Sequence, residues 1–179
     1  MRNIRRLLAI VFLPAAFAAP AAAQRTVSLE DGAITFELPE GFSEFTAEEL
    51  DLKYPDDPGS RRYAYGTRPD LTSSLAITLA PASLAPNQLP LLKEQTEEVL
   101  PRVNPSVRFV TREMVSINGW MWVHLEVTSR AADGQVHNHM FLTSFRGKML
   151  GFNFNTSEEK HAELGEQLLQ SSRSIRLTP

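Results

Sequence analysis

The chain has 179 residues, of which 42% are hydrophobic and 22% charged, and its formal net charge is -3. This balance is typical of one globular domain and excludes a disordered, collagen-like or coiled-coil chain. The sequence has no cysteine, which excludes disulfides, thiol nucleophiles, cysteine-based metal sites and a lipid-bearing cysteine.

Residues 1–23 have the pattern of a secretory signal peptide. Three arginines precede an apolar run from Leu7 to Ala19, and three alanines come directly before Gln24. The apolar run is shorter than the roughly 20 residues of a membrane helix, which argues against an uncleaved anchor. The arginine pair lacks the polar surroundings of a twin-arginine signal. We therefore predict general secretion and a periplasmic or secreted single domain, residues 24–179, with no membrane segment after cleavage.

Cleavage would change the charge of the protein. It leaves 15 basic against 21 acidic residues, a net charge of -6 over 156 residues. The segment Arg61–Tyr65 alternates arginines with aromatic residues, as single-strand nucleic-acid grooves do, but a charged edge strand gives the same pattern. Because an acidic protein repels phosphates, we favour the edge strand and expect no nucleic-acid partner.

The first half of the domain predicts three strands and two helices. Alternating apolar residues predict a strand over 32–39, and Thr46 with Glu49 forms a capping box that opens a short helix ending before Pro55. Two strands follow over 61–67 and 74–80, and then a linker over 81–86. Asn87 is expected to cap a helix with its buried stripe at Leu89, Leu92, Thr96, Val99 and Val103, and with Glu94, Glu97 and Glu98 in solvent.

The second half predicts a four-stranded antiparallel meander and a closing helix. The strands are expected over 107–117, 120–129, 135–145 and 148–155, with turns at Asn118-Gly119, Asp133-Gly134 and Arg146-Gly147. A capping box over Thr156–Glu159 is expected to open the last helix, in which Gly165 allows close approach to the sheet. The alternating segment Ser174–Leu177 is expected to hold the C-terminus in place.

This order predicts an α+β fold, an antiparallel sheet of about six to seven strands with helices on both faces, or α/β/α sandwich. The segment Phe36–Phe42, the Ile117–Gly119 hairpin and the closing Ser174–Leu177 resemble the PsbP-like family. The resemblance spans essentially the whole mature chain. It implies an α/β/α sandwich that serves mainly as a non-catalytic accessory or binding protein, and it brings no family-wide catalytic set.

One face of the predicted sheet combines aromatic and titratable residues. Alternation places Trp120, Trp122, His124 and Glu126 on one side of their strand, opposite a dry side, and His137, His139 and Phe141 on the same side of the next strand. A four-residue loop over 131–134 would set Glu126 opposite His139, whereas a two-residue loop would set it opposite Phe141. We interpret Trp120, Trp122, His124 and Phe141 as candidate ligand or partner contacts, with core packing as the alternative.

The His-x-His spacing is a metal-ligand pattern because alternate residues of a strand project together. Glu126, His137 and His139 are therefore candidate metal ligands, and hydrogen-bonded or solvated histidines are the alternative. His161, in the first turns of the last helix, is expected to be a boundary residue rather than a fourth ligand.

Motifs of nucleophilic and nucleotide chemistry are missing from the sequence: it has no Gly-x-Ser-x-Gly, no Gly-x-Gly-x-x-Gly and no phosphate-binding loop. We predict an exported, non-enzymatic accessory or binding protein of the cell envelope that engages a protein partner or a small ligand. The alternative is a metal-binding protein or metal-dependent hydrolase. No cofactor is expected outside that alternative, in which a divalent metal binds.

Overall fold

The computed structural model describes residues 25–54, 59–131 and 134–179. The predicted signal peptide, the residues from Pro55 to Pro58 and Asp133 of one predicted turn lie outside the described residues. Among the described helices, none combines the length and the apolar character needed to cross a membrane.

The described residues form two antiparallel sheets and three α-helices. The large sheet has the strand order β3-β4-β5-β9-β8-β7-β6 and the small sheet the order β1-β2-β10. The strands are β1 (Arg25–Leu29), β2 (Ile34–Leu38), β3 (Phe42–Glu44), β4 (Arg61–Thr67), β5 (Ser73–Ser83), β6 (Arg108–Ile117), β7 (Trp120–Ala131), β8 (Gly134–Phe145), β9 (Lys148–Ser157) and β10 (Arg176–Leu177). The helices are α1 (Ala47–Lys53), α2 (Leu89–Val103) and α3 (Glu158–Ser174), with a 3-10 turn, η1 (Pro86–Gln88), before α2.

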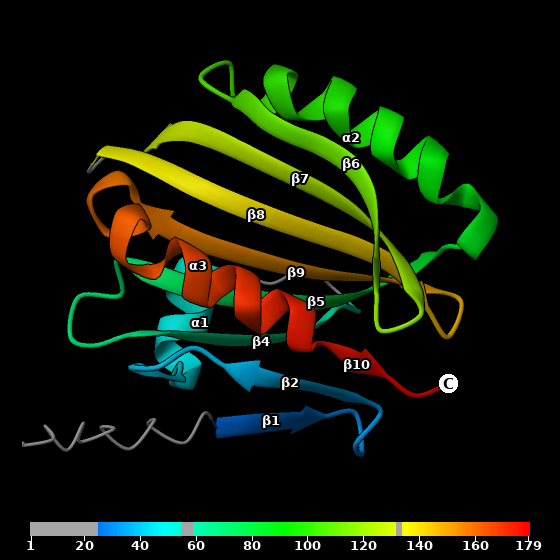
Figure 1. Cartoon of the computed structure of the whole chain (residues 1–179), viewed down its shortest axis with the longest axis horizontal. Coiled ribbons are helices and arrows are strands. Elements are labelled where there is room, and N and C mark those ends of the chain that lie inside the picture. Colours follow the sequence, from blue (N-terminus) through cyan, green and yellow to red (C-terminus); the bar gives the residue numbers. More distant parts are fainter. Residues whose placement is uncertain (1–24, 55–58, 132–133) are drawn as a thin grey trace, which may run out of the picture.

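The large sheet is covered on both faces, which confirms the predicted α/β/α arrangement. Helix α2 packs on one face, where Leu89 lies in a cluster with Val123 and Leu125. Helix α3 and the small sheet cover the other face, where Leu168 and Phe36 share a core with the aromatic residues of β7, β8 and β9. Figure 1 shows α2 beside β6 and α3 across the strands on the β9 side, with β10 next to β2.

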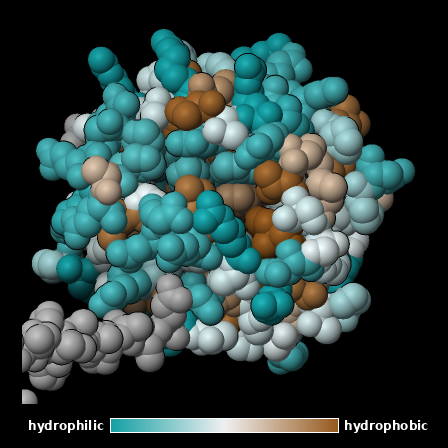
Figure 2. All heavy atoms as spheres, in the orientation of Figure 1, coloured by the Kyte–Doolittle hydropathy of each residue, from teal (hydrophilic) through white to brown (hydrophobic). Residues whose placement is uncertain are grey.

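Hydrophilic residues cover most of the side seen in Figure 1. Figure 2 shows hydrophobic residues there in small groups separated by hydrophilic ones. Most of the largest fully buried side chains, among them Trp122, Phe36 and Phe152, lie in the core on the α3 face of the large sheet. The surface seen in Figure 2 is thus mainly hydrophilic, and the large apolar side chains lie beneath it in the core.

Several local predictions are confirmed. Thr46 and Glu49 form the capping box of α1. Asn118 and Gly119 both have positive φ, 48° and 85°, as a two-residue hairpin turn requires. The Asn118 side chain also donates to the carbonyl oxygen of Ile175 at 2.8 Å, and β10 pairs with β2, so the C-terminus is held in place as expected.

The N-terminal half contains elements that the sequence prediction missed. Strand β1 was not expected, and the strand predicted over 32–39 pairs with β1 and β10 in the small sheet rather than joining the large one. The expected linker is partly wrong because β5 continues to Ser83. A register shift between Ala80 and Ser83 lets the strand pass Pro81, since a bulge tolerates a residue without an amide proton.

Helix boundaries account for the other corrections. Asn87 is not the cap of α2: it lies inside η1, and the cap position is Gln88, which makes no side-chain cap hydrogen bond. Val99 and Val103 are exposed, and Leu100 packs toward the sheet instead. The predicted capping box over Thr156–Glu159 is also wrong, because the cap is Ser157 and the third helical residue is Lys160, which cannot accept a hydrogen bond.

Candidate functional site

The register between β7 and β8 brings the predicted titratable residues together. Glu126 pairs with His139 and Thr128 with His137, the pairing expected for the longer loop. The ladder continues to Ala131 and Gly134, so the expected loop over 131–134 is too long although the expected pairing is correct. Directly paired residues have Cβ atoms about 4.5–5.5 Å apart, so side chains of this length can share a ligand.

All four histidines of the chain lie in one row of stacked rings, which we call the histidine row. The Phe141 ring stacks on His124 with centroids 4.3 Å apart, and His124 stacks on His139 at 5.6 Å. The row continues from β8 to α3, where His139 and His161 are 6.0 Å apart and His161 stacks on His137 at 3.9 Å. Two strands and a helix therefore deliver imidazoles to a single place.

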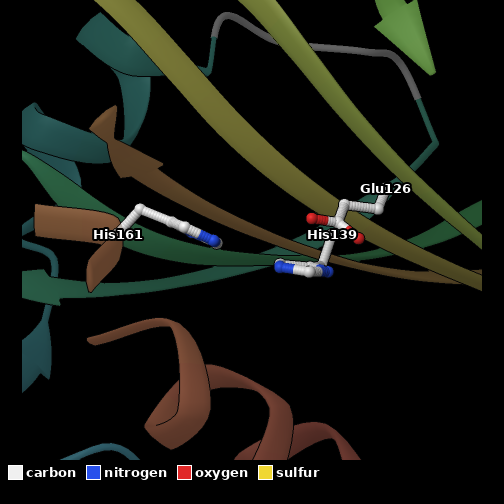
Figure 3. Close-up of side chains that lie close together, drawn as sticks. All are labelled: Glu126, His139 and His161. Carbon is white, nitrogen blue, oxygen red and sulfur yellow. The ribbon is translucent and has the colours of Figure 1, made fainter. Parts of the chain in front are cut away.

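Glu126, His139 and His161 form the tightest group of potential ligands, which we call the Glu-His-His group. One donor atom from each residue lies within 4.8 Å of the other two. Figure 3 shows His161 pointing toward the ring of His139, with the Glu126 carboxylate beside the His139 side chain. His161 thus belongs to the site rather than to its boundary, because the first turns of α3 lie over β8.

His137 takes a different position from the one expected of a third ligand. Its Nε2 lies 2.5 Å from Glu158 Oε2, and its ring stacks on His161. It is not a member of the Glu-His-His group. The His-x-His spacing therefore sends both rings to the same face, but only His139 reaches Glu126.

A hydrogen-bond chain runs from solvent to His139 and defines its free nitrogen. Glu113 Oε1 lies 3.0 Å from His124 Nδ1, and His124 Nε2 lies 3.4 Å from His139 Nδ1. Where the Glu113 carboxylate accepts from His124 Nδ1, His124 Nε2 is left to accept from His139 Nδ1. The remaining nitrogen, His139 Nε2, then has a free lone pair, and it is buried without a hydrogen-bond partner.

Two more ring nitrogens of the row, His137 Nδ1 and His161 Nδ1, are buried without partners. Native proteins pair most buried polar atoms, and each exception calls for an explanation such as a missing ion or water. Glu126 has one side-chain hydrogen bond, in which Thr111 Oγ1 donates to Glu126 Oε2 at 3.0 Å.

Burial keeps the central imidazoles neutral. It lowers the pKa of His139 to about 4, an effect opposed by the Glu126 carboxylate and reinforced by the three other histidines. Burial also lowers the pKa of His161, with His137 adding to the effect. Neutral imidazole is the form that acts as a ligand, so both rings are in the binding form at neutral pH.

The nearest neighbour of Gly165 is His161, a contact that the sequence did not predict. A Cβ placed on Gly165 would lie 3.1 Å from His161 Cε1 and 3.3 Å from its Nδ1. The histidine ring thus occupies the space that a side chain at Gly165 would need, one helical turn away.

The residues predicted as partner contacts lie mainly in the core. The exposed fraction is 0% for Trp122, 3% for Phe141 and 7% for His124, and only Trp120 is half-buried. The Trp122 ring makes an edge contact with Phe152 at 5.9 Å. Core packing, the alternative interpretation, therefore describes Trp122, Phe141 and His124, because they lie on the sheet face that α3 and the small sheet cover.

A groove of about 700 Å³ lies on the opposite face of the sheet. It is lined in part by Tyr54, Asn153 and Asn155. Because successive residues of β9 point to opposite faces, these asparagines point away from Phe152 and Phe154, and so away from the histidine row. Tyr54 Oη is within 3.2 Å of Ser74 Oγ.

Solved structures share this fold. No family model and no curated protein matches the chain in sequence. Cyanobacterial PsbP from Synechocystis superposes with a TM-score of 0.63 at 12% identity, over 92% of this chain and 98% of that one. The Ran-binding protein Mog1p of Saccharomyces cerevisiae superposes with a TM-score of 0.52 at 15% identity, over 88% and 96%. A Bacteroides thetaiotaomicron protein gives 0.55 at 12%, over 87% of this chain but 49% of its own. The PsbP-like fold expected from the sequence is thus confirmed.

Proposed function

We propose that this protein is a non-enzymatic binding protein of the cell envelope and that it holds a small ligand at the Glu-His-His group. The signal-peptide pattern of residues 1–23 supports export. The fold supports a binding role, since the similar structure of Mog1p is that of a Ran-binding protein.

The observation that carries the proposal is the convergence of Glu126, His139 and His161 around unpartnered nitrogens. A buried polar atom without a partner costs about 1–3 kcal/mol, so such a group lowers stability unless something binds there. An apolar residue at position 139 would fit the core at a lower cost, because the exposed fraction of His139 is 3%. The arrangement is therefore better explained by a ligand than by packing.

Thermal unfolding in the presence of small ligands tests the binding function. A panel of metal ions, carboxylates, phosphate and sugars is added to the wild-type protein and to the His139→Ala variant. A ligand at 100 times its Kd stabilises the folded state by about 2.7 kcal/mol. We expect at least one ligand to stabilise the wild type and not the variant. Equal stabilisation of both would place binding elsewhere, for instance in the groove beside Tyr54, and no stabilisation would contradict the function.

Export is tested separately. We expect the full chain, expressed in a Gram-negative host, to appear in the periplasmic fraction with its N-terminus at Gln24. An intact N-terminus in the cytoplasmic fraction would contradict the proposed location and leave the binding site in place.

A protein partner would engage a different part of the molecule. Among the four predicted contacts, Trp120 is the one with partial exposure, at the start of β7 beside the Asn118-Gly119 turn. We keep Trp120 as the proposed partner contact, because aromatic residues with an exposed edge are enriched at interfaces.

A further inference from the structure

We propose that Glu126, His139 and His161 bind a divalent first-row transition metal ion such as Zn²⁺, with His161 in the ligand position that the sequence assigned to His137. The ion is the ligand of the proposed binding function, so this site rests on that function. Two imidazoles and a carboxylate are a donor set that favours zinc and its neighbours over calcium and magnesium, which prefer oxygen ligands.

The spacing of the group is close to that of a loaded site. Donor atoms bound to one tetrahedral Zn²⁺ lie about 3.4 Å apart, given bonds of about 2.0–2.1 Å. The three donor atoms here lie within 4.8 Å of one another, so side-chain rotations that shorten these distances by up to about 1.4 Å close the site. Three protein ligands leave the fourth position open to water or to another ligand.

Neighbouring residues position each of the three proposed ligands. The Glu113–His124–His139 chain orients the His139 ring and leaves Nε2 free, much as a carboxylate behind a metal-ligating histidine fixes the orientation of its ring. Thr111 donates to Glu126 Oε2 and leaves Oε1 for the ion. His161 stands over Gly165 and against the His137 ring.

Burial separates this group from an ordinary surface cluster. The exposed fraction of His139 is 3%, and its Nε2 and the Nδ1 of His161 have no hydrogen-bond partner. Exposed acidic clusters remain hydrated, whereas these two ring nitrogens are shielded from water and make no hydrogen bond in its place. In the proposed site, the metal ion is the missing partner of His139 Nε2.

Titration calorimetry with ZnCl₂ tests the site on the purified, tag-free protein after removal of metal with EDTA. We expect one ion per chain. His161→Ala and Glu126→Gln should each weaken binding by at least about a hundredfold, more than the ten- to hundredfold typical of a second-shell partner. The matched control is His137→Phe, which keeps a ring stacked on His161. It should change the Kd by no more than about threefold, well below the ten- to hundredfold loss expected when a residue that orients a ligand is removed.

Glu113 supplies the test of the positioning chain. Glu113→Ala should weaken zinc binding about ten- to hundredfold, as loss of a carboxylate that orients a metal-ligating histidine does. Glu113→Gln should restore most of it, because the amide oxygen still accepts from His124 Nδ1. Unfolding curves of all variants, recorded without metal, show whether each variant is folded.

Three results would overturn the site: no zinc binding, binding unchanged in His161→Ala, or binding lost equally in His137→Phe. If zinc does not bind but another ligand stabilises the wild type and not His139→Ala, the binding function stands and the metal site fails. If the zinc-loaded protein hydrolyses esters and His161→Ala does not, the metal site stands and the non-enzymatic role fails.

Discussion

Two regions of the same sheet face differ in what burial does for them. In the aromatic region, Trp122 and Phe36 each contact Phe152 edge to face. These three side chains contain one polar atom, the indole nitrogen of Trp122, which has no hydrogen-bond partner. In the histidine row, the rings stack just as closely, yet three of their nitrogens are buried without partners. The first region stabilises the fold by removing apolar area from water, whereas the second costs stability until a ligand binds.

The largest expected effect is in the aromatic region. Trp122→Ala should lower the free energy of unfolding by about 3–5 kcal/mol, because it removes a fully buried ring from a packed core. Urea denaturation measures the change. Trp120→Ala, at a half-buried position, is the control and should cost clearly less. An equally small effect of both would indicate that Trp122 is a surface contact and would remove the contrast between the regions.

Acid should lower the stability of the protein through the histidine row and not through the aromatic region. The pKa of His139 is about 4 when folded and about 6.5 when unfolded, so the unfolded chain binds the proton more readily. Stability is therefore full above pH 6.5 and falls as the pH drops toward 4, by about 2 kcal/mol between pH 7.5 and 5.

Denaturation at several pH values, in EDTA, measures this slope. His139→Phe should flatten it in that range. Glu49, whose pKa the Arg68 guanidinium lowers from 4.5 to about 2, loses its own stabilising effect only as the pH falls through 4.5 toward 2, below the range used here. A slope unchanged in His139→Phe would show that the row is not the acid-sensitive region.

The smallest stability effect, with the sharpest consequence for the site, is expected at Gly165. Alanine favours a helix over glycine by about 1 kcal/mol, but its Cβ would lie 3.1 Å from the His161 ring, so the ring has to shift. We expect the stability of Gly165→Ala to stay within about 1 kcal/mol of wild type and its zinc affinity, measured by calorimetry, to fall. Unchanged affinity would mean that Gly165 does not position His161.

Local sequence patterns were enough to predict most of the large sheet. The Asn118-Gly119 turn fixes one hairpin through its positive φ values. Side-chain alternation places Glu126 and His139 on the same face, and their direct pairing is one of the two registers that the sequence left open. The Thr46 capping box is likewise a local interaction between residues three apart.

Features that depend on distant contacts were missed. Strand β1 exists through its pairing with β2, and β10 joins them from the other end of the chain. The direction in which His161 points depends on how α3 lies over β8, and the sequence spacing does not contain that information. The same holds for His137, whose Nε2 lies 2.5 Å from Glu158 Oε2 of α3.

A crystal structure of the protein grown with ZnCl₂, with anomalous data collected at the zinc edge, tests the central claim most directly. We predict one strong peak about 2.0–2.2 Å from Glu126, His139 and His161 together, as zinc bonds to nitrogen and oxygen require. A peak bound by His137 and Glu158 instead, or no peak at the histidine row in a crystal that binds zinc elsewhere, would contradict it.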